Sequence, residues 1–222
     1  MGGRGPVIAD VSDPANPRQL EEYVIEEYRQ RVQVEGSYAY VAGDAGLEIL
    51  DVSDSGKTSR IAQFGDSMAR GVDVRDGIAY LAVPDNGVEV VDVTNPASPQ
   101  KIATVAGTKG ACDVHIHDEL LYVARHEAGI TILDISDSRE PEFIGNFRHD
   151  DRGEAKGIWG DGEYVFIAGN RITMLDVSEP NSPYEVGEYG RRGGHDLCVD
   201  GEFVYVASGI KGLLVLQFDQ EN

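Results

Sequence analysis

The sequence predicts an all-β fold, a β-propeller of four-stranded antiparallel blades, and two repeated features point to it. An aromatic residue set among small and branched apolar residues recurs at Tyr40, Tyr80, Tyr122, Phe166 and Tyr205. An aspartate at the end of an apolar run recurs at separations of 41, 41, 42 and 42 residues, at Asp10, Asp51, Asp92, Asp134 and Asp176. A period of about 40 to 45 residues without a helix-length apolar stretch is typical of a propeller, in which each repeat forms one blade.

The unit that follows Arg70 shows how each repeat divides into strands. Hairpin signals stand at Arg75-Asp76-Gly77 and at Pro84-Asp85-Asn86-Gly87, each between two alternating apolar runs. Prolines at positions 96 and 99 prevent ladder pairing there, because proline has no N–H to donate. The expected strands are therefore residues 71–74, 78–83, 88–93 and 101–105.

Counting strands gives the number of blades and the expected closure of the ring. Five inner strands, near residues 32, 72, 114, 158 and 197, predict five blades; six blades is the alternative and would need two more inner strands. We expect an N-terminal strand, residues 20–25, to join the C-terminal blade near residues 213–218 and remove its open edge. Residues 7–11 are then surplus, and they either pair with strand 20–25 or remain loose.

The repeat is continuous, so the sequence predicts one propeller domain over residues 1–222. Its expected parts are a closing segment 1–28, blades at 29–70, 71–110, 111–153 and 154–192, and the C-terminal part of the closing blade at 193–222.

Two stretches of the first full repeat carry a resemblance to a known family. They are Val32-Gln33-Val34-Glu35-Gly36-Ser37-Tyr38-Ala39-Tyr40-Val41-Ala42 and Gly46-Leu47-Glu48-Ile49-Leu50-Asp51-Val52-Ser53-Asp54. The chain resembles the LVIVD-repeat family of β-propellers over nearly its whole length. The resemblance implies the fold and an extracellular or cell-surface location, and it supplies no catalytic residues. The last unit departs from the pattern, with Gln217 in place of the aspartate.

Charge narrows the classes of partner. The formal net charge is −20, and the basic residues comprise 14 Arg and 5 Lys. An acidic surface repels phosphate backbones and anionic headgroups, which argues against nucleic acid as a partner. The longest apolar stretches have the length of strands, and no signal peptide or lipidation motif is present, so no membrane insertion is expected. Excess acid with little lysine also fits adaptation to high salt; the alternative is an ordinary acidic extracellular propeller.

The candidate ligand site is the mouth of the central channel, where the inner strands begin. Scaffold positions should repeat from blade to blade, and the positions at this mouth do not. The candidate ligand-binding residues are Gln30, Arg31, Arg70, Cys112, Asp113, Lys156, His195 and Asp196. Cations here would suit a small anionic or polar ligand; the alternative is that these exposed positions vary freely.

One step further along the inner strands, Asp73 and His115 belong to adjacent blades. We expect a hydrogen bond between them that keeps His115 partly protonated; a catalytic acid–base pair is the alternative. His115-x-His117 and His126 form only a weak zinc pattern, so no metal ligand is assigned. The sequence contains no calcium loop, nucleophile elbow, phosphate loop or dinucleotide fingerprint, so no cofactor and no catalytic residue are assigned. Cys112 and Cys198 lie in non-neighbouring blades and are expected to be free thiols.

Two functions from different classes remain. The first is a non-enzymatic binding or interaction module that presents loops around the mouth to a protein, a glycan or a small anionic or polar ligand, with a monomer as the default state. The alternative is a hydrolase or lyase at the mouth, with His195, Asp196, Asp113, Lys156 and Arg70 as the residues to suspect. The sequence leaves open whether the protein is an enzyme.

Overall fold

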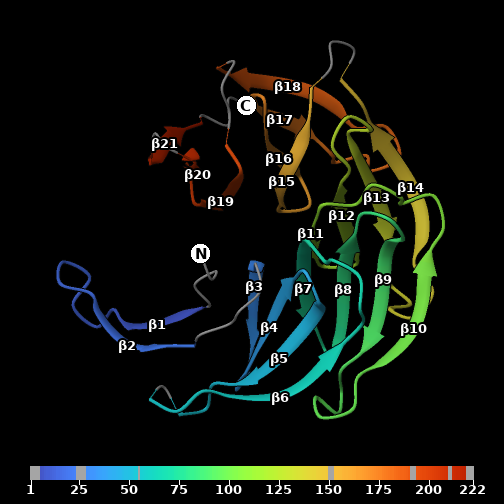
Figure 1. Ribbon diagram of the computed structural model, residues 1–222. Helices are drawn as coiled ribbons and strands as arrows, with labels where there is room; N and C mark the ends of the chain where they lie inside the picture. The colour runs from blue at the N-terminus through green and yellow to red at the C-terminus, as the bar shows by residue number, and fades with distance from the viewer. Residues whose placement is uncertain are drawn as a thin grey trace.

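The computed structural model is a five-bladed β-propeller, which confirms the predicted fold (Figure 1). It describes residues 6–23, 29–54, 56–149, 153–190, 194–209 and 212–218. The inner strands β3, β7, β11, β15 and β19 surround the axis in Figure 1, and the outer strands form the rim. No helix among these residues is long and apolar enough to cross a membrane.

Each blade is an antiparallel meander whose first strand lies innermost. Blade 1 consists of β3 (Arg29–Glu35), β4 (Tyr38–Gly43), β5 (Gly46–Asp51) and β6 (Ser59–Phe64). Blade 2 consists of β7 (Gly71–Arg75), β8 (Ile78–Val83), β9 (Gly87–Asp92) and β10 (Gln100–Val105). Blade 3 consists of β11 (Asp113–His117), β12 (Leu120–Ala124), β13 (Ile130–Asp134) and β14 (Glu142–Phe147). Blade 4 consists of β15 (Ala155–Gly160), β16 (Tyr164–Gly169), β17 (Ile172–Asp176) and β18 (Tyr184–Tyr189). Blade 5 consists of β19 (Asp196–Asp200), β20 (Phe203–Ala207) and β21 (Leu213–Gln217).

Local chemistry explains the turns. Asp76 and Gly77, between β7 and β8, have φ values of 53° and 72°, as a two-residue hairpin turn with the twist of the flanking strands requires. The repeated aspartates accept a hydrogen bond from the backbone N–H two residues later; Ser53 N to Asp51 Oδ1 is one case, at 2.9 Å. These aspartates shape the turn after the third strand, so their recurrence reflects the scaffold.

The hydrophobic core is divided among the junctions between blades. At the first junction, Tyr40 and Ile49 of blade 1 pack with Val72 and Val74 of blade 2. The equivalent residues form the other junctions, and side chains such as Ile49 and Val72 are almost fully buried. Blades 2, 3 and 4 therefore bury one face against the preceding blade and the other against the following one, whereas Val32 of blade 1 and Leu213 of blade 5 are exposed.

The two ends of the ring meet differently from the expected closure. β1 (Val7–Asp10) pairs with β2 (Arg18–Glu22) in a separate two-stranded sheet, which is one of the two arrangements expected for residues 7–11. β21 pairs with β20, and the expected ladder between residues 20–25 and 213–218 does not occur among the described residues. The reason is that the hairpin is docked on blade 1, where Glu21 accepts two hydrogen bonds from Thr58, both at 2.7 Å. At the axis, an ion pair between Arg31 and Asp196 joins the first blade to the last.

Candidate functional site

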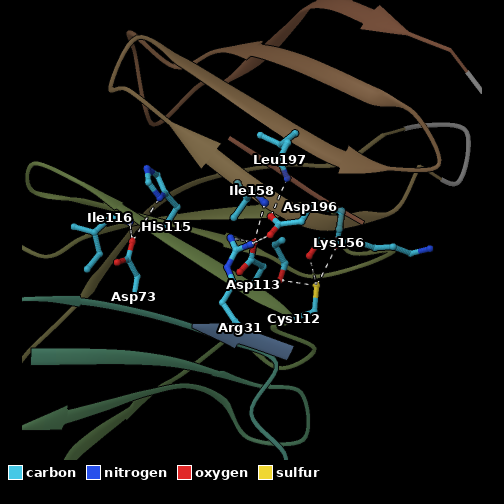
Figure 2. A network of polar contacts seen from close by, with 12 residues as sticks. Arg31, Asp73, Cys112, Asp113, His115, Ile116, Lys156, Ile158, Asp196 and Leu197 are labelled. Atoms are coloured by element: carbon cyan, nitrogen blue, oxygen red, sulfur yellow. Dashed lines mark hydrogen bonds and ion pairs between the residues drawn. The ribbon is translucent and has the colours of Figure 1, made fainter. Parts of the chain in front are cut away.

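Arg31 is the centre of a polar network at the mouth that joins three blades (Figure 2). Its guanidinium contacts Asp113 Oδ2 through Nη2 at 2.8 Å, and it contacts Asp196 Oδ2 through Nη1. Asp113 and Asp196 begin the inner strands of blades 3 and 5, and Arg31 is at the equivalent position of β3 in blade 1, so the three predicted mouth residues lie together. Burial alone would lower the pKa of Arg31, but Asp113 and Asp196 together raise it.

Asp113 is the most strongly perturbed carboxyl of the network. Its side chain is 5% exposed, and its Oδ2 also accepts a hydrogen bond from Ile158 N of blade 4 at 3.0 Å. Its Oδ1 is buried without a hydrogen-bond partner. Burial raises the pKa of Asp113 to about 7, against the opposing effect of Arg31. The carboxyl therefore changes charge near neutral pH at the point where three blades meet.

Glycines make room for these carboxylates. A Cβ on Gly71 would lie 2.8 Å from Asp113 Cα, and a Cβ on Gly157 would lie 2.8 Å from Asp196 Cα. Both distances are too short for carbon atoms that are not bonded. Gly71 and Asp113 occupy the same repeat position in adjacent blades, and so do Gly157 and Asp196, so a glycine alternates with an aspartate around the mouth.

The expectation of a partly protonated His115 is wrong. His115 Nδ1 lies 3.5 Å from Asp73 Oδ2, but burial lowers the pKa of His115 to about 4, so the imidazole is neutral at neutral pH. Its Nε2 lies 3.1 Å from Gly160 O, and its ring stacks on Trp159. Asp73 in turn accepts a hydrogen bond from Ile116 N at 2.9 Å. This pair joins the inner strands of blades 2, 3 and 4, which is a structural arrangement.

A second cluster at the mouth brings Arg70, His126, Lys156 and Glu154 together from blades 2, 3 and 4. Arg70 Nη1 lies 3.0 Å from His126 Nε2, and Lys156 Nζ lies 2.8 Å from Glu154 Oε2. Burial and then Arg70 lower the pKa of His126, so its ring is neutral and Nε2 accepts the hydrogen bond from Arg70. The hydrogen bond from Lys156 lowers the pKa of Glu154, so this pair is ionised.

Arg70 differs from the other mouth cations in its surroundings. Within the described residues, no carboxylate forms an ion pair with Arg70, and its Nε is buried without an acceptor. Lys156 is compensated by Glu154, and Figure 2 shows its ammonium directed away from Asp113 and Asp196. Arg31 is compensated twice. Arg70 is thus a mouth cation without a paired carboxylate among the described residues, unlike Arg31 and Lys156.

The remaining predicted site residues have other positions. Cys112 is buried, with Sγ 3.1 Å from Ala155 O, and burial raises the pKa of its thiol to about 12. His195 is exposed beside Gly209. The side chain of Gln30 lies outside the described residues. Cys112 and Cys198 are both free thiols.

Sequence reasoning assigned His126 only to a weak metal pattern and overlooked its contact with Arg70. Its loop reaches blade 4 through two backbone hydrogen bonds with Ala155, at 2.9 and 3.0 Å, and His126 has a φ of 48°. The loop Arg125-His126-Glu127-Ala128-Gly129 was the available signal, since it enters the same end of the channel as Arg70. In the described part of the chain, no group of three or more His, Cys, Asp or Glu side chains is placed to hold a metal.

An open hollow lies at the opposite end of the propeller, between blades 2 and 3. It is lined by Arg75, Asp118, Glu119, Leu120 and Asp134. These residues belong to turns and strand ends remote from the mouth.

Comparison with known proteins gives one family. The model of the LVIVD repeat matches residues 2–24, 28–61, 66–106, 109–149, 152–190 and 192–217. No curated protein matches the chain.

Solved structures share the fold at low sequence identity. A protein from Lactobacillus plantarum is 13% identical with a TM-score of 0.81, over 94% of this chain and 72% of that one. A functionally unknown protein from Desulfotomaculum acetoxidans is 19% identical with a TM-score of 0.73, over 91% of this chain and 69% of that one. The computationally designed Ika8 protein is 10% identical with a TM-score of 0.67, over 90% of this chain. This chain spans 62% of the length of Ika8.

Proposed function

This chain belongs to the LVIVD-repeat family, and on that premise we propose that it is a binding module that holds a small anion at the channel mouth through Arg70. A propeller of this kind is a rigid scaffold whose loops meet at the mouth. The observation that carries the proposal is the half-buried guanidinium of Arg70, which has a neutral imidazole as neighbour and an Nε without an acceptor.

The surroundings of Arg70 support a carboxylate or phosphate as ligand. A guanidinium offers donors in a planar fork that fits two oxygens of either group. His126 is fixed by its hydrogen bonds to Ala155, so it holds Arg70 in one position. Lys156 lies within electrostatic range of His126. An anion bound at Arg70 would therefore compete with Glu154 for the ammonium of Lys156.

The carboxylates of the mouth favour binding over catalysis. Asp113 Oδ2 and both carboxylate oxygens of Asp196 accept hydrogen bonds from Arg31 or from backbone N–H groups, which supports a structural role for these carboxylates. The open hollow lies at the other end, away from these groups.

Titration calorimetry with inorganic phosphate and with succinate tests the proposal. The wild-type protein should bind one of them, and the affinity should fall as the salt concentration rises. Arg70→Ala should remove the binding, and Lys156→Ala should weaken it.

Arg18→Ala is the matched control. Arg18 is an exposed arginine paired with Asp10 at 2.8 Å, so its removal changes the net charge by the same amount far from the mouth. If Arg18→Ala and Arg70→Ala lower the affinity equally, or if neither anion binds the wild type, the proposed site is wrong.

A further inference from the structure

The hollow between blades 2 and 3 has a size that a small molecule can fill. Its volume is about 640 Å³, and ligand sites in proteins measure roughly 300–1,000 Å³. The side chains that line it are those of Arg75, Asp118, Glu119, Leu120 and Asp134. Blades 2 and 3 are both complete four-stranded sheets, so the hollow is not a gap left between the two ends of the chain.

Leu120 explains why there is room in this hollow. It begins β12 and pairs with Asp134, the repeated aspartate of blade 3. In blades 1, 4 and 5 the residue at this position of the second strand is aromatic, namely Tyr38, Tyr164 and Phe203. A leucine is shorter than an aromatic side chain, so it leaves an apolar floor with space above it. An apolar group of a ligand can therefore lie on Leu120.

The equivalent aspartates of the neighbouring blades indicate what Asp134 can bind. In blade 2 the Oδ2 atom of Asp92 accepts a hydrogen bond from Arg139 Nη2. In blade 4 the Oδ2 atom of Asp176 accepts one from Tyr184 OH at 2.9 Å. Asp134 uses Oδ1 in its own turn, and within the described part of the chain its Oδ2 accepts no hydrogen bond. This oxygen can therefore take a donor from a ligand in the hollow.

A cation and three carboxylates line the hollow without pairing with each other. Arg75 Nε lies 3.9 Å from Asp76 Oδ2, which is outside the hollow, and no ion pair joins Arg75 to the carboxylates of the hollow among the described residues. Asp118 Oδ2 lies 3.4 Å from His117 Nε2. Glu119 forms no ion pair with any residue that the structure describes. Opposite charges held apart across one hollow suit a ligand that carries both charges.

We propose that this hollow binds a zwitterionic small molecule with an apolar side chain, namely a free α-amino acid. The carboxylate of the ligand would bind the guanidinium of Arg75 in a fork. Its ammonium would bind Asp134 Oδ2 and the carboxylate of Glu119, and its side chain would lie on Leu120. An anion without an ammonium would meet three carboxylates, and a cation without a carboxylate would lie beside an unpaired guanidinium. The proposal is independent of the anion site at Arg70, which lies at the opposite end of the propeller.

The probe is L-leucine, compared with two analogues that each lack one charged group. Isocaproate lacks the ammonium, and isoamylamine lacks the carboxylate. Binding to the isotope-labelled full chain is followed by two-dimensional NMR. L-leucine should shift the amide signals of residues 75, 118–120 and 134 saturably. Each analogue should bind about tenfold or more weakly than L-leucine, because it loses the charge-assisted hydrogen bonds of one end.

Two variants separate the two ends of the ligand. Arg75→Gln should weaken the binding of L-leucine by about tenfold and leave that of isoamylamine no weaker, because only a carboxylate binds Arg75. Glu119→Gln should weaken the binding of both. Glu163→Gln is the matched control, because Glu163 is the exposed glutamate that precedes β16 as Glu119 precedes β12. It should bind L-leucine like the wild type. Circular dichroism checks the fold of the variants, and the comparison of the three ligands on the wild type does not depend on them.

Three results would overturn the proposal. The first is the absence of saturable shifts at the residues of the hollow. The second is isoamylamine that binds as tightly as L-leucine, because the hollow would then be acidic surface that attracts any cation. The third is binding of L-leucine that Arg75→Gln leaves unchanged.

Discussion

Replacing Arg31 with Met should destabilise the protein strongly at pH 8 and much less at pH 5. Methionine keeps much of the apolar stem but removes the cation between Asp113 and Asp196. Breaking a buried ion pair by removing one partner costs about 3–5 kcal/mol, because the other charge remains buried. Asp113 is 5% exposed, so this magnitude applies to it; Asp196 is 43% exposed, and its share is about 1 kcal/mol or less.

The pH dependence follows from the pKa of Asp113. Its value of about 7 in the folded protein is above the ordinary value of 3.8, so the folded state binds more protons than the unfolded state between these values. This carboxyl therefore makes the folded state less stable as the pH rises from about 4 through about 7. Without Arg31 the pKa of Asp113 rises further, so the stability of the variant continues to fall at higher pH. The free energies of unfolding of the wild type and the variant therefore differ most above pH 7. At pH 5 Asp113 is protonated in both, and the loss should be about 1 kcal/mol.

Urea denaturation followed by circular dichroism at pH 5 and pH 8 gives the free energy of unfolding. Arg18→Met is the control, because it removes the same charge from an exposed pair and should change the free energy of unfolding little at either pH value. A loss for Arg31→Met that is equal at the two pH values, or below about 1 kcal/mol at pH 8, would refute the assigned role of the pair.

Three further predictions concern packing, salt and thiols. Gly71→Ala should lower the free energy of unfolding in urea by about 1–3 kcal/mol, because the new Cβ would overlap Asp113 Cα. Gly187→Ala is the control and should not lower it, because the nearest atom to its Cβ is Met174 Cβ at 4.0 Å. If both variants lose the same stability, steric overlap at Gly71 is not the cause. The melting temperature should rise between tens of millimolar and molar potassium chloride by more than in a near-neutral propeller, and a flat profile would count against high-salt adaptation. In the folded protein an aromatic disulfide reagent should modify the exposed Cys198 and leave the buried Cys112 unmodified, and unfolding in urea should make Cys112 reactive as well. Rapid reaction of both thiols in the folded protein would contradict the structure.

The blades could be predicted from sequence because each one solves the same packing problem. Apolar residues such as Tyr40 and Val72 recur in register, and the period alone identifies the strands they occupy. The closure of the ring could not be predicted in this way. Residues 7–11 have the pattern of a third strand, but that pattern does not say which strand they pair with. Contacts of Glu21 and Tyr23 with blade 1 decide the position of that hairpin, and neither residue belongs to the repeat.

The site was predictable as a set of positions but not as a set of contacts. Alignment of the repeats placed Arg31, Asp113 and Asp196 beside the mouth, while their ion pairs depend on which blades face each other across the axis. The compensation of Lys156 by Glu154 follows from local rotamers that a sequence does not specify. The burial that makes His115 neutral also depends on the neighbouring blades, which the sequence of one repeat does not show.

The alternation of glycine and aspartate at the mouth limits how blades can be exchanged. Blade 2 carries Gly71 where blade 3 carries Asp113, and blade 4 carries Gly157 where blade 5 carries Asp196. Two aspartate blades placed side by side would bring a Cβ against the backbone of the neighbouring inner strand, and two glycine blades would leave Arg31 with one carboxylate in place of two. Blades 2 and 3 therefore form one pair and blades 4 and 5 another, and a shuffled ring would keep these contacts without overlap only if each pair moved together.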